Sequence, residues 1–316
     1  MTETKIRCSA APLIIAEVRS EYKMGNIYIG IIMLLRIVQH MFNKRSSSEI
    51  GGFTMFVKYG AYRQLFSAAL GLLLIIIAGK GFRFNAVTII TATVSGLALF
   101  GNLMCSQTVL KSGTMALNAL FGTAGMLVPC IAGIFLFDAP MSAGQLFGVG
   151  LLIVSSYFLI SSSSKIHTKF TFKTFLLLMG TMLSNGITML MQQMFAHYVP
   201  DGDVSVFSLF SFGIVGVALL LLSFPLNMRK TGESKPLSKK LLFYGAILST
   251  AVFIINQLAT ISTVLVPPAV LFAFINGGST IIAAVVAAVC FKEKLTFRSV
   301  CGVLMGVTAL VVIKAI

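Results

Sequence analysis

The sequence has no tryptophan, only three histidines and only nine acidic residues among 316. No carboxylate lies well inside a long apolar run, since Glu49, Asp138, Asp201, Asp203 and Glu293 all fall in short polar separators. Enzymes embedded in membranes need clustered carboxylates, a Ser/His pair or an HExxH metal site. The sequence shows none of these patterns and no phosphate-binding loop. We therefore expect no catalytic residues, no enzyme activity and no direct use of ATP.

Cysteine is also sparse, with five residues, no CxxC pair and no histidine beside any of them. Four of the five lie inside apolar runs, where cysteine usually acts as a small hydrophobic residue. We therefore expect no disulfide framework, no metal site and no cofactor.

Charge is scarce as well: charged residues make up 10% of the chain and hydrophobic residues 57%. A soluble domain usually carries about a quarter charged residues. The net charge of +15 is concentrated in short gaps between apolar runs, as expected beside anionic lipid headgroups. The partner that this composition indicates is the lipid bilayer and not nucleic acid.

Apolar runs long enough to cross a bilayer, which takes roughly 20 residues, recur along the chain. Backbone groups in lipid must pair within the segment, so these runs predict helices. The expected fold is an all-α integral membrane protein. The ten predicted spans are 24–43, 59–79, 86–109, 115–137, 142–161, 173–196, 204–226, 241–264, 268–291 and 298–315.

An internal repeat appears when the second half is shifted back by 154 positions, so that Asn102 lies over Asn256 and Gly148 over Gly302. Five spans per half is an odd number, which inverts one half relative to the other. Inverted repeats typically place a binding site at the midplane. The predicted units are a first five-helix repeat, 24–162, a second, 172–316, and a polar extension, 1–23, with Met24 as an alternative start of translation.

Polar residues recur at helical spacing inside several spans, and polar groups in hydrocarbon are costly without a partner. Such stripes indicate either a polar central cavity or ordinary hydrogen bonding between packed helices. The candidate substrate-binding residues are Arg36, Gln39, His40, Arg63, Asn102, Asn185, Gln192, Asn256 and Asn276.

The two arginines are the sharpest of these candidates. The guanidinium group is expensive in a membrane and offers a fixed fork of donors to phosphate or carboxylate. With Arg36 and Arg63 inside predicted spans and no acid beside them, the sequence favours an anionic or zwitterionic small-molecule substrate.

Glycines predict close packing and bending. Gly144–Gly148 and Gly302–Gly306 have GxxxG spacing, which suits packing inside a monomer or a homodimer interface. Gly125 and the segment Asn276-Gly277-Gly278 are expected to allow local bending, and Pro129 to kink its helix.

The segment from Phe291 to Thr296, followed by Gly302, and its degraded counterpart from Asp138 to Ser142 resemble the turns that close each half of EamA-type carriers. By this resemblance the chain is similar to the drug/metabolite transporter superfamily, which includes relatives of nucleotide-sugar transporters. The resemblance implies ten helices, alternating access through a central cavity, and both termini in the cytoplasm.

The function that these patterns favour is secondary transport of a small metabolite. The alternatives are a lipid-linked sugar flippase and a non-transporting membrane scaffold. The expected location is a membrane, and short connecting loops favour the plasma membrane of a bacterium. Orientation stays open, because the cation-rich connections favour the reverse of what the resemblance implies.

Overall fold

The computed structural model describes residues 3–79, 82, 85–111, 115–138, 141–161, 171–229, 236–292 and 296–315. Every regular element in these ranges is a helix. The elements are α1 (Glu3–Ser47), α2 (Phe53–Ala78), α3 (Ala86–Lys111), α4 (Met115–Ala124), α5 (Leu127–Leu136), α6 (Ala143–Ser161), α7 (Phe172–Tyr198), α8 (Val204–Arg229), α9 (Lys239–Ser262), α10 (Pro268–Phe272), the π-helix η1 (Ala273–Gly278), α11 (Ser279–Phe291) and α12 (Phe297–Ala315). The predicted turn residues Pro140, Glu293, Lys294 and Leu295 lie outside the described residues.

Nine helices in the described part of the chain are long and apolar enough to span a membrane. The first of these spans is Tyr22–Ser47, so α1 continues beyond its membrane segment toward the N-terminus. The predicted span 142–161 corresponds to α6, whose apolar part, Ala143–Leu159, is shorter than the other nine. The prediction of an all-α, multi-pass membrane protein is therefore confirmed, and the count by this measure is nine.

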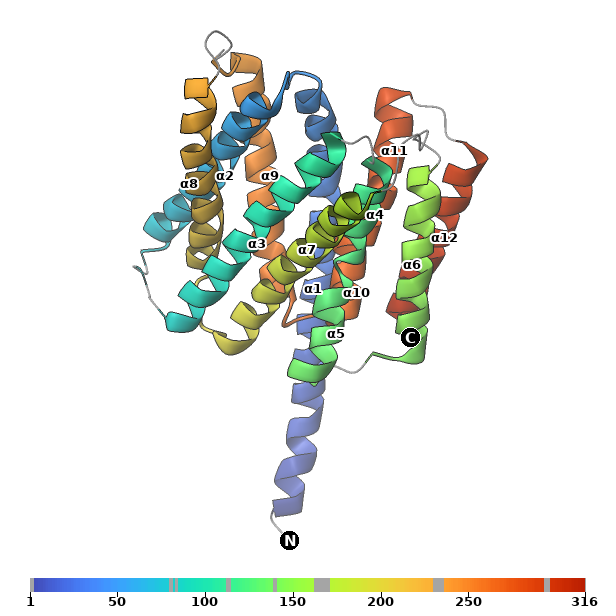
Figure 1. Ribbon diagram of the computed structural model, residues 1–316. Helices are drawn as coiled ribbons and strands as arrows, with labels where there is room; N and C mark the ends of the chain where they lie inside the picture. The colour runs from blue at the N-terminus through green and yellow to red at the C-terminus, as the bar shows by residue number, and fades with distance from the viewer. Residues whose placement is uncertain are drawn as a thin grey trace.

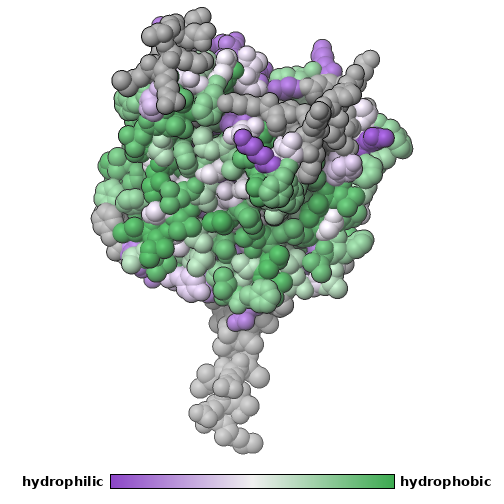
Figure 2. Space-filling view, viewed as in Figure 1, coloured by the Kyte–Doolittle hydropathy of each residue, from purple (hydrophilic) through white to green (hydrophobic). Residues whose placement is uncertain are grey.

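The surface of the bundle is apolar along its middle. Many large hydrophobic side chains are exposed on it, among them Phe135 at 79%, Val289 at 72% and Ile77 at 71%, an accumulation that is unusual on a water-soluble surface. Figure 2 shows the middle of this surface as a nearly continuous hydrophobic zone, with hydrophilic residues gathered mainly toward the upper end. This zone is the surface that lipid tails would cover.

Two predicted spans, 115–137 and 268–291, are present but are not regular α-helices throughout, and their irregular points lie at or beside the glycines where bending was predicted. The first is broken between α4 and α5 at Gly125–Met126. Pro129 explains the break, because a proline ring collides with the carbonyl four residues earlier, here that of Gly125. The second contains the π-helix η1 between α10 and α11. Single π-helical turns inside α-helices are rare and occur frequently at functional sites.

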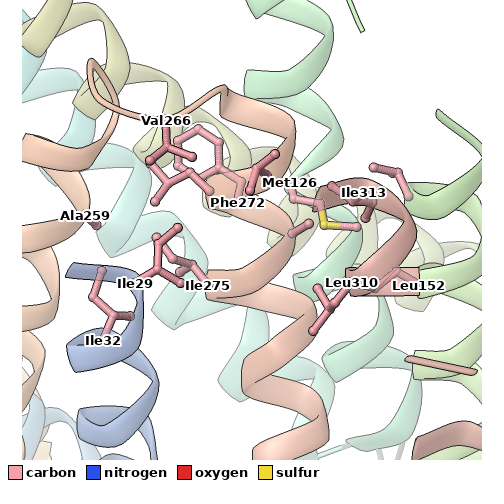
Figure 3. Packing of buried hydrophobic residues seen from close by; sticks show 14 of the residues in the cluster. Ile29, Ile32, Met126, Leu152, Ala259, Val266, Phe272, Ile275, Leu310 and Ile313 are labelled. Atoms are coloured by element: carbon pink, nitrogen blue, oxygen red, sulfur yellow. The ribbon is translucent and has the colours of Figure 1, made fainter. Parts of the chain in front are cut away.

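The main hydrophobic cluster surrounds η1, so the irregular segment is held from several sides. Phe272 and Ile275 meet Ile32 of α1, Leu152 of α6 and Leu310 of α12 in this cluster (Figure 3). Leu152 leaves no room for a Cβ atom on Gly277, and a Cβ on Gly278 would displace the end of the Met33 side chain. The π-helical turn is therefore packed rather than loose.

The predicted GxxxG faces pack inside the chain. α6 lies along α12, where a Cβ on Gly148 would lie 2.5 Å from Ile313 Cγ1. A Cβ on Gly302 would lie 2.9 Å from Leu159 Cγ, and one on Gly306 would lie 2.6 Å from Ser155 Oγ. These three glycines serve close helix packing within one molecule.

The bundle has two distinct ends. Both termini lie toward the lower end in Figure 1, while α1, α8 and α11 end, and α2, α9 and α12 begin, at the upper end. At the upper end Lys240 Nζ and Glu49 Oε1 form an ion pair at 2.5 Å, which ties the α1–α2 connection to the start of α9. The lower end carries the connections α7–α8 and α9–α10.

Candidate functional site

The polar face of α1 meets the segment that follows the π-helix. His40 Nε2 and Ser279 Oγ lie 2.8 Å apart, and Arg36 Nη1 donates to Gln39 Oε1 at 2.7 Å. Because residues four apart share one face of a helix, Arg36 lies on the same side of α1 as His40. Three predicted residues are therefore grouped where α1 packs against η1 and α11.

Arg36 also has a hydrogen-bond donor that is not paired. Its Nε atom is buried and has no hydrogen-bond partner. A buried unpaired donor costs about 1–3 kcal/mol, and more when the group is charged. Water or an anionic group that reaches Arg36 would satisfy this donor.

Arg63 sits elsewhere, on α2 beside α9. Its Nε is likewise buried without a partner, and its Cζ lies 5.7 Å from the centre of the Tyr59 ring. Ser249 Oγ donates to the Arg63 carbonyl at 2.9 Å, which ties the two helices together. Tyr59 is 2% exposed, a buried phenol that was not predicted from the sequence.

The two broken helices are joined by a polar group that we name the hinge cluster: Thr123, Asn276, Ser279 and Thr280. The hydroxyl oxygens of Thr123 and Thr280 lie 3.1 Å apart. Thr280 Oγ1 donates to the Asn276 carbonyl at 3.1 Å, and Asn276 Nδ2 contacts Met189 Sδ of α7 at 3.3 Å. Of these four residues only Asn276 was predicted. Ser279 and Thr280 stand three and four residues after it, a helical spacing that could have identified them.

A second polar group links α3, α4 and α7. Asn118 Nδ2 donates to Ser106 Oγ at 2.6 Å, and Thr181 Oγ1 donates to Asn118 Oδ1 at 3.3 Å. The predicted residue Asn102 donates to the Thr181 carbonyl at 3.0 Å. Asn118 was not singled out from the sequence, because it has no polar neighbour at i+3 or i+4 on its own helix.

The amides of α7 complete the arrangement. Asn185 Nδ2 donates to the Gly122 carbonyl, just before the α4–α5 break, at 2.7 Å. Gln192 donates to Asn256 Oδ1, and Asn256 Nδ2 in turn donates to Ser208 Oγ at 3.2 Å. Bonds of Asn102 and Asn185 to carbonyls of other helices have the geometry of interhelical packing, which was the alternative interpretation of the polar stripes.

A cavity of about 360 Å³ opens toward the lower end of the bundle. It lies between the end of α5, the end of α7 and the connection from α9 to α10, and none of the nine predicted residues lines it. Its lining consists of Phe137, Gln193, His197, Thr263, Val264, Leu265, Val266, Pro267 and Pro268. Within the described residues, no three His, Cys, Asp or Glu side chains lie together as a metal site would require.

Comparisons with known proteins inform the fold and not the chemistry. No protein-family model matches the sequence, and no curated protein matches it. Twenty-eight chains of solved structures are similar to it. One is a crystal structure described only as that of a protein, which superposes with a TM-score of 0.70 over 91% of this chain and 98% of the other, at 12% sequence identity. The chain therefore shares its helical fold, over nearly its whole length, with a protein of known structure.

Proposed function

We propose that this protein is a secondary transporter that moves a small metabolite across a membrane by alternating access through its polar centre. It uses no ATP and catalyses no reaction. The observation that carries the proposal is that the corresponding fourth spans of the two halves both depart from a regular α-helix, at adjacent positions. Gly125, at the α4–α5 break, corresponds at the 154-residue offset to Ser279, where η1 gives way to α11. Paired interruptions of this kind are the best sequence-level pointer to a transporter binding site.

The hinge cluster supports this assignment. Thr123 and Thr280 connect the two interruptions directly, and His40 brings the arginine-bearing face of α1 to the same place. In a membrane, irregular helical backbone is tolerated where it is buried in protein or lines a water-filled cavity. A substrate bound here would contact both halves of the bundle, which is what alternating access requires.

The helix pairs support ten crossings arranged as two inverted five-helix repeats. If the two halves are exchanged helix by helix, the α3–α7 contact becomes α9–α1 and the α3–α8 contact becomes α9–α2. All four of these contacts are present. The pairs α2–α8 and α6–α12 exchange with themselves. In Figure 1 each helix of the second half runs opposite to its counterpart, as in α1 and α7.

The length of α6 fits a tenth crossing. A helix of 19 residues is about 28 Å long, close to the ~30 Å hydrocarbon core of a bilayer. Both termini lie toward one end of the bundle, as an even number of crossings requires (Figure 1).

Arg36 favours an anionic or zwitterionic substrate. Its guanidinium lies inside a span that contains no carboxylate, and its Nε donor is unpaired. A carboxylate or phosphate would satisfy that donor with a charge-assisted hydrogen bond, among the stronger kinds in proteins. The resemblance to EamA-type carriers does not select a substrate class, which is left to experiment.

The test is counterflow into liposomes that contain the purified protein. Nucleotide sugars, sugar phosphates, amino acids, amines and neutral sugars are supplied in turn. We expect exchange of an anion or zwitterion, reduced at least tenfold by Arg36→Gln, because one charge-assisted bond is worth roughly 1.5–3 kcal/mol. Arg298→Gln, at an exposed arginine near the start of α12, is the matched control and should exchange normally.

Four outcomes would overturn parts of the proposal. Exchange of neutral solutes alone, or equal loss in both arginine variants, would remove Arg36 from the binding site. Transbilayer movement of lipid-linked sugars without solute exchange would identify a flippase. Neither activity, in protein that keeps its wild-type melting behaviour, would favour a scaffold.

A further inference from the structure

The cavity at the lower end has a chemistry of its own, separate from that of the arginine face. Its volume of about 360 Å³ lies within the range of sites for small organic molecules. Apolar walls come from Val264, Val266 and Pro267 in the α9–α10 connection and from Phe137 at the end of α5. The polar groups converge from α7 and from the end of α9.

Gln193 is the most informative of these groups. Its side chain lines the cavity, is 4% exposed, and carries an Oε1 atom that is buried without a hydrogen-bond partner. The side chain also lies against α5, since its Nε2 would be 3.7 Å from a Cβ on Gly133. A buried amide oxygen left unpaired is costly, so a ligand donor that reaches it restores the lost interaction. The terminal torsion of glutamine is soft, which lets the oxygen turn toward the cavity.

The other polar groups also offer acceptors. Thr263 Oγ1 donates its hydrogen to the Thr260 carbonyl at 2.7 Å, so toward the cavity this oxygen can only accept. The rings of His197 and Phe137 form an edge contact, with their centres 4.8 Å apart. The faces of the Phe137 ring carry negative charge density, which attracts cations. No lysine or arginine lines the cavity, and the residue that follows Phe137 is Asp138.

We propose that this cavity binds a primary ammonium group attached to a small hydrocarbon, such as an aryl or alkyl amine. The ammonium donates to Gln193 Oε1 and Thr263 Oγ1 and lies near the ring of Phe137. The hydrocarbon packs against the apolar residues of the α9–α10 connection. The site is distinct from the arginine face of α1, and its occupancy does not depend on transport.

The experiment is equilibrium binding to the purified protein in mild detergent. The probes are benzylamine, benzyl alcohol and benzoate, three molecules of similar size that differ in charge and hydrogen bonding. Binding is measured by calorimetry and by saturation-transfer NMR. The variants are Gln193→Leu, which removes the amide at nearly constant volume, and Gln193→Glu, which replaces it with a carboxylate. Gln107→Leu, at a half-buried glutamine of α3 outside the cavity, is the matched control.

We expect benzylamine to bind the wild-type protein, benzyl alcohol more weakly, and benzoate not at all. Gln193→Leu should weaken benzylamine binding about tenfold, Gln193→Glu should strengthen it severalfold, and Gln107→Leu should leave it unchanged. Equal affinity for all three probes would overturn the proposal, as would equal effects of Gln193→Leu and Gln107→Leu. So would an unchanged affinity in Gln193→Glu. Failure of counterflow together with Gln193-dependent amine binding would reject the transport proposal alone.

Discussion

Single polar side chains hold this bundle together at points where the hydrophobic effect gives little help. In a bilayer the lipid tails are as apolar as leucine, so helix association depends on packing and on hydrogen bonds between helices. Gln192 and Asn256 join α7 to α9, and Asn256 passes the connection on to Ser208 of α8. Three helices thus meet through one chain of amide and hydroxyl groups.

We predict a measurable coupling between Gln192 and Asn256. Double-mutant cycles in membrane proteins give about 0.6 kcal/mol on average for such pairs, and up to about 1.7 kcal/mol. The variants Gln192→Leu, Asn256→Leu and the double variant, unfolded by a detergent titration, should return a coupling in that range. The pair Gln192 and Ser106, whose side chains bond different partners, serves as a control and should give additive effects. Additivity within error in the first cycle would contradict the prediction.

The grouping of Arg36, Gln39 and His40 was predictable, because their spacing alone puts them on one face of a helix. The contact between Thr123 and Thr280 was not, since the two residues are far apart in the sequence and meet only through tertiary packing. Sequence patterns thus identify polar faces, and the structure supplies their partners.

Among the elements, the two broken helices depart furthest from what a sequence shows. The α4–α5 break follows from Pro129, whose clash with the Gly125 carbonyl is a local rule readable in advance. For the π-helix the sequence predicted only local bending at Asn276-Gly277-Gly278 and not the π-helical turn itself. Leu152 and Met33, from other helices, occupy the space beside Gly277 and Gly278. The lengths of the apolar runs predict the spans. The π-helical turn within one span depends on side chains from neighbouring helices.

We predict that a larger residue at the position on α7 that faces the α4–α5 break lowers the stability of the protein. A Cβ on Gly186 would lie 2.5 Å from Val128 Cβ and 2.6 Å from the Gly125 carbonyl oxygen. Gly186→Ala should therefore destabilise the protein by about 1–3 kcal/mol, the usual range for overpacking. Gly213→Ala, at a helical glycine of α8 with no atom within 4 Å of its added Cβ, should be neutral or slightly stabilising. Thermal unfolding in detergent measures both, and equal melting temperatures would show that α5 moves freely.

At the scale of the whole molecule, positive charge is gathered at the end opposite the termini. Helix ends at the upper end carry Lys44, Arg45, Lys173, Lys239, Lys240, Lys292 and Arg298 among others, with Glu49 paired to Lys240. The lower end carries Asp138, Asp201 and Asp203 together with Lys23 and Lys314. Cation-rich connections usually stay in the cytoplasm. The charge distribution thus favours an orientation opposite to the one that the family resemblance implies.

We predict that the upper end faces the cytoplasm. In a background without native cysteines, Asp201→Cys at the lower end should react with an impermeant maleimide in intact cells. Ser47→Cys, at the exposed end of α1, should react only after the membrane is opened. The reverse pattern of labelling would place both termini in the cytoplasm and show that the charge bias is overridden.

The arginine-bearing, carboxylate-free interior has an electrical consequence. No acidic side chain inside the spans can take up a proton to cancel the charge of a bound anion. Uncompensated movement of a monoanion would then carry one elementary charge per cycle as a current. A potential of 100 mV is worth about 2.3 kcal/mol per charge, roughly a fiftyfold concentration ratio at equilibrium. One-for-one exchange of anions with equal charge would carry no current. A voltage clamp could therefore distinguish uniport from exchange in the proposed transport, even before the substrate is identified.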